Sequence, residues 1–125
     1  MNRLEFLQQL LLLPLTNFFR TSTPKEKVIY SACVAGFQYY EGNKILQLLS
    51  QNDVLTLSRQ PNNRYDERAI EIFWKSHKIG YIPMADNLIL ANMLDSGIAL
   101  QAKIKAVKPQ NPDWKKVKVN VYLES

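Results

Sequence analysis

Six short segments rich in strand-forming residues, joined by short connections, constrain the fold of this chain most strongly. Apolar and polar residues alternate through much of them, which is typical of strands with one buried face. Most of the connections are too short for the crossover that joins parallel strands, so we expect the strands to run antiparallel. The segments lie at residues 27–35, 54–59, 69–74, 78–82, 98–107 and 116–123.

Two short helices are expected between these strands. The first covers residues 44–50, with Ile45, Leu48 and Leu49 as its apolar face. The second begins after Asp86, a residue type that caps helices, and ends at Gly97. This pattern predicts a mainly β fold, namely a small OB-like barrel of six antiparallel strands with two short helices.

The charge of the chain is concentrated near its C-terminus. The whole sequence of 125 residues carries a formal charge of +5, and its length suits a single core. Residues 98–125 hold six lysines against two acidic residues, whereas residues 1–97 hold ten basic residues against nine acidic ones. This distribution points to an anionic partner for the C-terminal quarter. The single cysteine, Cys33, excludes an internal disulfide.

The first 26 residues differ in composition from the rest, and residues 27–125 are expected to form the folded domain. The segment MNRLEFLQQLLLLPLTNFFR is too short in its apolar part to span a bilayer. Two interpretations remain open: an export leader with Arg3 ahead of a leucine-rich stretch, or a short helix that ends at Pro14 and packs on the domain. A leader would favour an envelope module that binds peptide or glycan, and otherwise the protein is expected in the cytoplasm. Residues 21–26 read as a polar linker.

Residues able to perform catalysis are scarce. His77 is the only histidine and falls in a predicted turn, and Cys33 lies within a predicted strand without a histidine near it in sequence. The glycines form neither a Walker loop nor a dinucleotide-binding motif. We therefore predict a protein that is not an enzyme and has no cofactor or metal. The alternative is a metal-dependent nuclease that uses Asp66 and Glu71.

Lysines and aromatic residues favour a binding module instead. Alternation places Lys103 and Lys105 on one side of their strand and Lys116 and Lys118 on one side of the next, so pairing of the two strands would gather four lysines on one face. Such a face either contacts an anion or only keeps the protein soluble. Tyr39, Tyr65 and Trp114 fall in connections, where rings can serve as stacking platforms for single-stranded nucleic acid.

Three segments in this order resemble the HIRAN domain: VAGFQYYEG at 34–42, DVLTLSRQPNNRYDERAIEIFW at 53–74, and HKIGYIPMADN followed by LANMLDSG within 77–97. The likeness covers residues 28 to 123 and is strongest to stand-alone bacterial members. It implies an OB-like barrel that binds single-stranded DNA and, in the members fused to fork-remodelling ATPases, its free 3′ end. The resemblance thus implies a role in DNA repair, with a helicase or nuclease supplied by another chain as a partner.

The resemblance also assigns roles to residues of the loop at 60–69. Tyr39 and Tyr65 match positions that contact the terminal bases, and Asp66 matches the carboxylate that accepts a hydrogen bond from a 3′-hydroxyl. The chain departs from the end-binding pattern at three positions. Gln38 stands where arginine is usual, Met84 where a basic residue is usual, and Tyr81 where a polar side chain is usual. The nucleic-acid-binding residues expected from pattern and resemblance together are Gln38, Tyr39, Arg59, Asn62, Asn63, Tyr65, Asp66, Tyr81, Lys103, Lys105, Trp114, Lys116 and Lys118.

Overall fold

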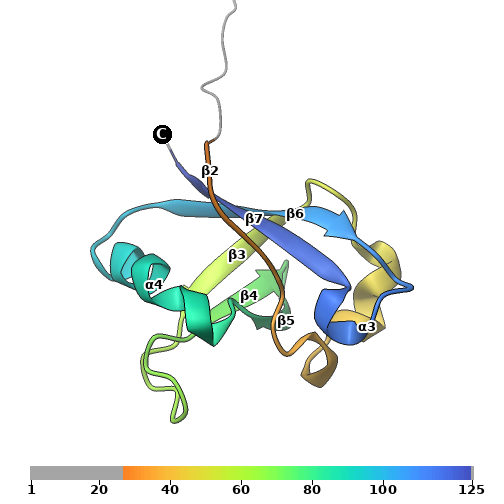
Figure 1. The fold of residues 1–125 in the computed structure, drawn as a ribbon, viewed down its shortest axis with the longest axis horizontal. Coiled ribbons are helices and arrows are strands. Elements are labelled where there is room, and N and C mark those ends of the chain that lie inside the picture. The colour runs from red at the N-terminus through yellow and green to blue at the C-terminus, as the bar shows by residue number, and fades with distance from the viewer. Residues whose placement is uncertain (1–26, 125) are drawn as a thin grey trace, which may run out of the picture.

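The computed structural model describes residues 27–124, which form one coiled antiparallel sheet with short helices at its ends (Figure 1). The sheet has six strands in the order β2-β7-β6-β3-β4-β5, and each neighbouring pair is antiparallel. The strands are β2 (Lys27–Cys33), β3 (Val54–Arg59), β4 (Ile70–Trp74), β5 (His77–Tyr81), β6 (Leu100–Val107) and β7 (Val117–Leu123). The mainly β, antiparallel fold predicted from the sequence is confirmed. The expected leader or helix at residues 1–20 lies outside the described residues.

Two α-helices and four single turns of 3₁₀-helix connect the strands. The α-helices are α3 (Gly42–Ile45) and α4 (Asn87–Asp95), which lie at opposite ends of the molecule in Figure 1. The 3₁₀ turns are η1 (Phe37–Tyr39), η2 (Leu46–Leu48), η3 (Met84–Asp86) and η4 (Asp113–Lys115). Among residues 27–124, no helix is long and apolar enough to cross a membrane.

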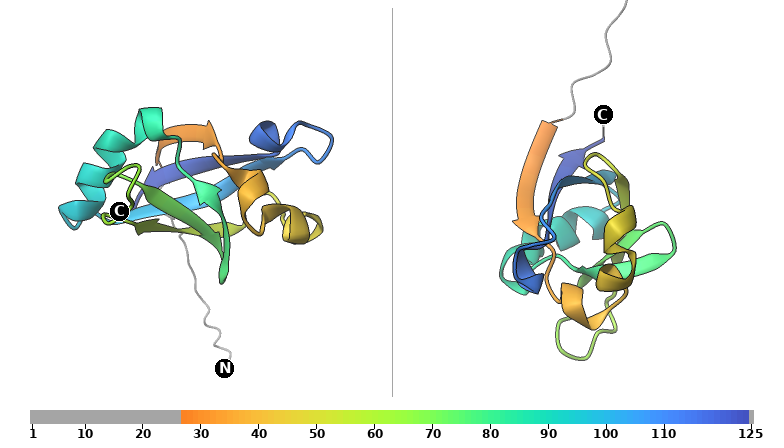
Figure 2. Two further views of the ribbon diagram at one scale, coloured as in Figure 1. Left: turned by 90° about the horizontal axis from the view of Figure 1, so that it is seen from below. Right: turned by 90° about the vertical axis from the view of Figure 1, so that its right-hand side faces the viewer.

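The coiled sheet brings its two edge strands together. Ala35, which follows β2, and Tyr81 at the end of β5 exchange two backbone hydrogen bonds of 2.8 and 2.9 Å. This bridge joins the edges of the sheet at one point, and the views in Figure 2 show the strands curled around the interior. Gly80 makes the close approach possible, because its φ is +149° and a Cβ there would overlap the Ala35 carbonyl oxygen and Val34.

The core lies between the two halves of the coiled sheet and under the helices. Alternate residues of β7 point into it, since Val117, Val119 and Val121 are buried while the residues between them are half-buried. The buried cluster comprises Val34, Phe37, Ile45, Leu49, Leu55, Ile70, Ile72, Trp74, Ile79, Ile82, Leu90, Ala91, Ala102, Ile104, Val117, Val119 and Val121.

Two local expectations were wrong. The segment 44–50 is not one helix, because α3 ends at Ile45 and a 3₁₀ turn follows, which leaves Leu48 61% exposed. His77 is not in the turn but opens β5, where its Nδ1 lies 2.6 Å from Glu41 and its ring stacks on Trp74. A third expectation is confirmed, because Asp86 is the N-cap residue of α4; its side chain makes no capping hydrogen bond, and its carboxylate accepts one from the Tyr30 hydroxyl at 2.7 Å.

Candidate nucleic-acid interface

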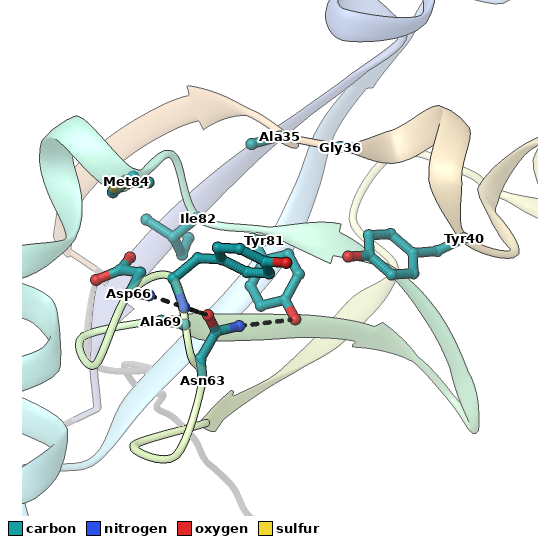
Figure 3. Close-up of a pocket in the computed structure, with 10 residues that line it drawn as sticks. Ala35, Gly36, Tyr40, Asn63, Asp66, Ala69, Tyr81, Ile82 and Met84 are labelled. Atoms are coloured by element: carbon teal, nitrogen blue, oxygen red, sulfur yellow. Dashed lines mark hydrogen bonds between the residues drawn. The ribbon is translucent and has the colours of Figure 1, made fainter.

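A pocket of about 280 Å³ opens where the bridged strands meet the loop at 60–69, which we call the end loop (Figure 3). The chain after β2 forms one wall, the end of β5 and the start of η3 form another, and the end loop forms the third. In Figure 3, Asp66 and Met84 lie at one side of the pocket and Tyr40 at the other. The lining is mostly apolar or aromatic: Ala35, Gly36, Tyr40, Asn63, Tyr65, Asp66, Ala69, Tyr81, Ile82 and Met84.

Asn63 organises the end loop from within. Its Oδ1 accepts hydrogen bonds from the backbone N–H groups of Tyr65 (2.8 Å) and Asp66 (3.0 Å), which is the local side-chain-to-backbone pattern that asparagine favours in turns. Its Nδ2 donates to Gln60 Oε1 at 2.8 Å. Asn63 therefore fixes the backbone that carries Tyr65 and Asp66, whereas Asn62 is exposed to solvent.

Arg59 ties the end loop to helix α4. Its Nε and Nη2 donate to the two carboxylate oxygens of Asp95 at 2.9 and 3.2 Å, and its Nη1 and Nη2 donate to the carbonyl oxygens of Ala69 and Glu67 at 2.8 and 3.0 Å. A guanidinium in such a bidentate pair is strongly oriented. Arg59 was expected among the nucleic-acid-binding residues, and its position makes it a support for the loop.

Asp66 holds a carboxylate at the edge of the pocket. Its Oδ1 accepts a hydrogen bond from the backbone N–H of Arg68 at 3.0 Å, and its Oδ2 accepts one from Asn87 Nδ2 at 2.7 Å. Asn87, the first residue of α4, is only 2% exposed. A carboxylate offers about four lone-pair sites, so two acceptor positions remain after these contacts.

Lys78 lies between two tyrosines that line the pocket, Tyr40 and Tyr81, which we call the tyrosine wall. Its Nζ is 4.3 Å from the ring centroids of both Tyr40 and Tyr81, donates to the Tyr81 hydroxyl at 2.8 Å and pairs with Glu71 at 3.1 Å. Burial lowers the pKa of Lys78, but the hydrogen bonds to Tyr81 and Glu71 outweigh it and leave the pKa raised. Tyr81 in turn donates to Gln60 Oε1 at 2.7 Å, so the tyrosine wall is joined to the end loop.

Among residues 27–124, three aromatic rings are exposed: Tyr65 at the pocket, and Tyr39 and Trp114 outside its lining. Tyr65 is 82% exposed, Tyr39 on η1 is 76% exposed, and Trp114 on η4 is 60% exposed. The turns η1 and η4 pack against each other, and Asn43 Nδ2 donates to Asp113 next to Trp114 at 3.3 Å. Gln38, also on η1, is exposed. Rings with so much of their surface exposed fit stacking platforms.

The four lysines expected on one face do not form a uniform face: two lie in β6, one in β7, and Lys116 just before β7. Strands β6 and β7 pair as expected, but the register shifts between Ile104 and Ala106, so Lys105 sits in a bulge and is exposed. Lys103 and Lys118 are half-buried, and the Lys103 ammonium lies 5.6 Å from the Tyr122 ring centroid. Lys116 pairs with Asp113 at 2.7 Å and donates to Asn43 at 3.1 Å, so its ammonium is already engaged.

Only part of the expected set gathers at the pocket. Asn63, Tyr65, Asp66 and Tyr81 line it, while Trp114 and the lysines lie on other surfaces. Sequence reasoning missed Tyr40, Lys78 and Asn87. The repeated Tyr39-Tyr40 pair was the available signal for Tyr40, since one ring of such a pair can face inward when the other faces solvent. For Asn87, 21 residues from its partner Asp66, no local signal exists.

The two carboxylates named for the alternative nuclease are engaged separately. Glu71 pairs with Lys78, and Asp66 is held by Asn87 and the Arg68 backbone. Within the part of the chain that is described, no group of three or more His, Cys, Asp or Glu side chains could hold a metal ion.

Comparison with known families decides the kind of domain. The HIRAN domain family model matches residues 29–125. The chain belongs to the HIRAN domain family. HIRAN domains are nucleic-acid-binding modules, and the pocket, end loop and tyrosine wall of this HIRAN domain lie within the matched residues.

Proteins similar to this HIRAN domain include one that is much longer than this chain and one solved chain that the match covers almost completely. The chain is 26% identical over 102 residues to the helicase-like transcription factor of Oryctolagus cuniculus, a match that covers 78% of this chain but 9% of that protein. Its fold resembles a crystal structure of a protein from Lactobacillus plantarum (TM-score 0.69, 23% identity, 79% of this chain and 95% of the other). It also resembles the HIRAN domain of human HLTF (TM-score 0.62, 20% identity, 75% of this chain and 73% of the other).

Proposed function

We propose that this HIRAN domain binds single-stranded DNA by its 3′-hydroxyl end, with the terminal nucleoside in the pocket, and performs no catalysis itself. The observation that carries the proposal is the Asp66 carboxylate. It lies at the edge of a mostly apolar pocket with acceptor positions to spare, next to the exposed ring of Tyr65. A carboxylate accepts a hydrogen bond from a hydroxyl group and repels a phosphate, so it suits a strand end better than an internal phosphodiester.

The surroundings of Asp66 suit the rest of a terminal nucleoside. Apolar and aromatic walls can cover a sugar and a base, and stacking on Tyr65 would contribute about 1–3 kcal/mol per base. Beyond the pocket, Tyr39 and then Trp114 offer further platforms for the next bases of the strand. Their separate 3₁₀ turns, η1 and η4, pack side by side.

The end loop carries two exposed cations beside the pocket, Arg64 and Arg68. Gln38 and Met84 carry no charge, and the Lys78 ammonium is already paired with Glu71. Farther from the strand end, Lys103, Lys105 and Lys118 are assigned to the strand backbone. Any processing of the bound strand is expected from a helicase or nuclease on another chain.

The test compares strand ends by fluorescence anisotropy at low salt. The wild-type chain should prefer an oligodeoxynucleotide with a 3′-hydroxyl over the same oligonucleotide with a 3′-phosphate by about tenfold or more, the value of one charge-assisted hydrogen bond. Asp66→Asn should bring this ratio toward one. Absence of binding to either oligonucleotide would discard the proposal.

A matched control separates the role of Asp66 from loss of negative charge in the loop. Glu67→Gln neutralises the adjacent, exposed carboxylate and should leave the end preference intact. Asp66 accepts two hydrogen bonds within the protein, so Asp66→Asn must be shown to be folded by circular dichroism before its binding is interpreted. If Asp66→Asn is folded and keeps the wild-type preference, the end loop is only a structural turn and does not recognise the strand end.

A further inference from the structure

Asn87 is the single polar residue that is buried among residues 27–124, with 2% of its surface exposed. A buried amide without a partner is costly, so its hydrogen bond has to be found within the protein. Its Nδ2 donates to Asp66 Oδ2 at 2.7 Å, a short bond in which the acceptor is a carboxylate. The buried amide is thus aimed at the group to which we assign recognition of the 3′-hydroxyl.

The end loop is fixed to helix α4 at both ends of that helix. Asn87, the first residue of α4, binds Asp66, and Asp95, the last residue of α4, binds Arg59 at the base of the loop. The Arg59 contacts hold the loop backbone through Ala69 and Glu67. Among the hydrogen bonds of the described residues, only the Asn87 contact acts on the Asp66 side chain from outside the loop.

We propose that Asn87 is a positioning residue for end recognition: it fixes the rotation of the Asp66 carboxylate so that its remaining lone pairs face the terminal hydroxyl. This inference rests on the proposed function and assigns a residue that determines its specificity. Oδ1 is held by the Arg68 backbone and Oδ2 by Asn87, so both oxygens of the carboxylate are fixed before a ligand arrives. Fixing a binding group in advance removes the cost of ordering it on binding.

A positioning role predicts a change in specificity rather than a general loss of affinity. Without Asn87 the carboxylate can rotate about its terminal torsion, and the hydrogen bond to the strand end weakens. Stacking on Tyr65 and contacts with phosphates do not depend on that torsion. The ratio of affinities for two strand ends that differ by one hydroxyl therefore reports on Asn87 directly.

The probe is a short single-stranded oligodeoxynucleotide with either a 3′-hydroxyl or a 3′-deoxy (dideoxy) terminus, which differ by the hydroxyl alone and carry equal charge. The wild-type full chain should prefer the hydroxyl end by about tenfold. Asn87→Leu, close in size, should reduce the preference to about twofold or less and change affinity for the deoxy end little. Asn92→Leu, the same substitution at an exposed position of α4, should keep the wild-type ratio.

Asn87→Asp provides a second test that does not depend on Asn87→Leu folding. Two carboxyl groups in hydrogen-bond contact share a proton, because like charges raise one of their pKa values. At pH near 5 the protonated carboxyl group of the Asn87→Asp variant can donate to Asp66 as the amide does, so the preference for the hydroxyl end should return. Above the raised pKa of this pair, located by NMR of the carboxyl carbons, both groups are charged and the preference should be lost. A purely structural role would give no such recovery of the ratio.

The outcomes separate this inference from the proposed function. No hydroxyl preference in the wild-type chain, or one that survives in Asp66→Asn, would overturn the proposed function. A wild-type preference that is lost in Asp66→Asn but is kept in folded Asn87→Leu would overturn the role of Asn87 alone. A ratio in Asn87→Asp that is the same below and above the pKa of the carboxyl pair would overturn it as well, whether or not Asn87→Leu folds.

Discussion

The side chains of the adjacent residues Tyr65 and Asp66 differ in how firmly the protein holds them. The Asp66 carboxylate is fixed by two hydrogen bonds, whereas the Tyr65 ring is 82% exposed and its backbone N–H is held by Asn63. An exposed ring gives up little internal packing when it stacks on a base. We therefore expect Tyr65 to supply affinity and Asp66 to supply preference for the strand end.

Tyr65→Ala should weaken binding of 3′-hydroxyl and 3′-phosphate oligonucleotides by the same factor, about fivefold to a hundredfold, because a stacked base does not sense the terminal group. Stability should change little because the ring is exposed. Tyr65→Phe keeps the ring and should bind nearly as wild type. Anisotropy with both oligonucleotides checks this, and a loss confined to one end would contradict it.

Lys78 is the residue whose removal should most disturb the tyrosine wall. Lys78→Met leaves Glu71, which has only 15% of its side chain exposed, without its ion-pair partner, and should lower the free energy of unfolding by about 1–3 kcal/mol. Lys78→Met combined with Glu71→Gln should recover part of this loss. Lys44→Met, at an exposed position, is the control. Equal midpoints for Lys78→Met and wild type in urea would contradict the assignment.

The stabilisation by the Lys78–Glu71 ion pair should depend on pH in a predictable way. The pKa of Lys78 is raised in the folded protein, so its stabilisation is fully present below the ordinary lysine pKa and is lost as pH rises through the folded-state value. The stability difference between wild type and Lys78→Met should therefore shrink only at alkaline pH. Urea denaturation of both proteins at a series of pH values measures this difference, and a decrease already near neutral pH would contradict the assignment.

Among the elements, the bridge between the end of β2 and β5 places the pocket walls next to each other. Gly80 allows it, since a side chain there would meet both an unfavourable φ and the Ala35 carbonyl. Gly80→Ala should lower the free energy of unfolding by about 2–5 kcal/mol, the sum of the positive-φ penalty and overpacking. Gly97→Ala shares the positive φ, at +83°, but has no atom within 4 Å of its added Cβ, so it should cost only about 1 kcal/mol. Similar losses for both variants in urea denaturation would contradict a steric role for Gly80.

The lysines that we assign to the nucleic-acid backbone lie in β6 and β7, and they differ in environment from Lys116, which precedes β7. Lys105→Gln or Lys118→Gln should each reduce the slope of log affinity against log salt by up to about 0.7, the value for one phosphate contact on a single strand. Lys116→Gln should reduce it less, because Asp113 already pairs with Lys116 and the pKa of Asp113 is lowered by Lys116 and then by Asn43. Slopes that do not change in the Lys105 and Lys118 variants would assign these lysines to solubility alone.

At the scale of the whole molecule, the fold was predictable from the sequence because strand alternation and short connections are local signals. They placed β3 at its observed bounds and the other strands within two residues, and Gly97 after α4 as a left-handed stop. Prediction failed where local pattern does not decide, as in the switch from α3 to a 3₁₀ turn. The Asp66–Asn87 and Lys78–Tyr40 contacts join distant residues and could not be read from spacing. The family resemblance pointed to the end loop as the binding site, and the role of this loop in binding stays a prediction.

The most direct test of the central claim locates the bound strand. Backbone amide resonances of the full chain should be followed by two-dimensional NMR during titration with a short 3′-hydroxyl oligodeoxynucleotide at low salt. We expect the largest shifts at Gly36, at residues 63–69 of the end loop and at residues 81–84, excluding the amide-free Pro83, with smaller shifts at the lysines of β6 and β7. Shifts confined to β6 and β7, or none at all, would contradict recognition of the strand end in this pocket.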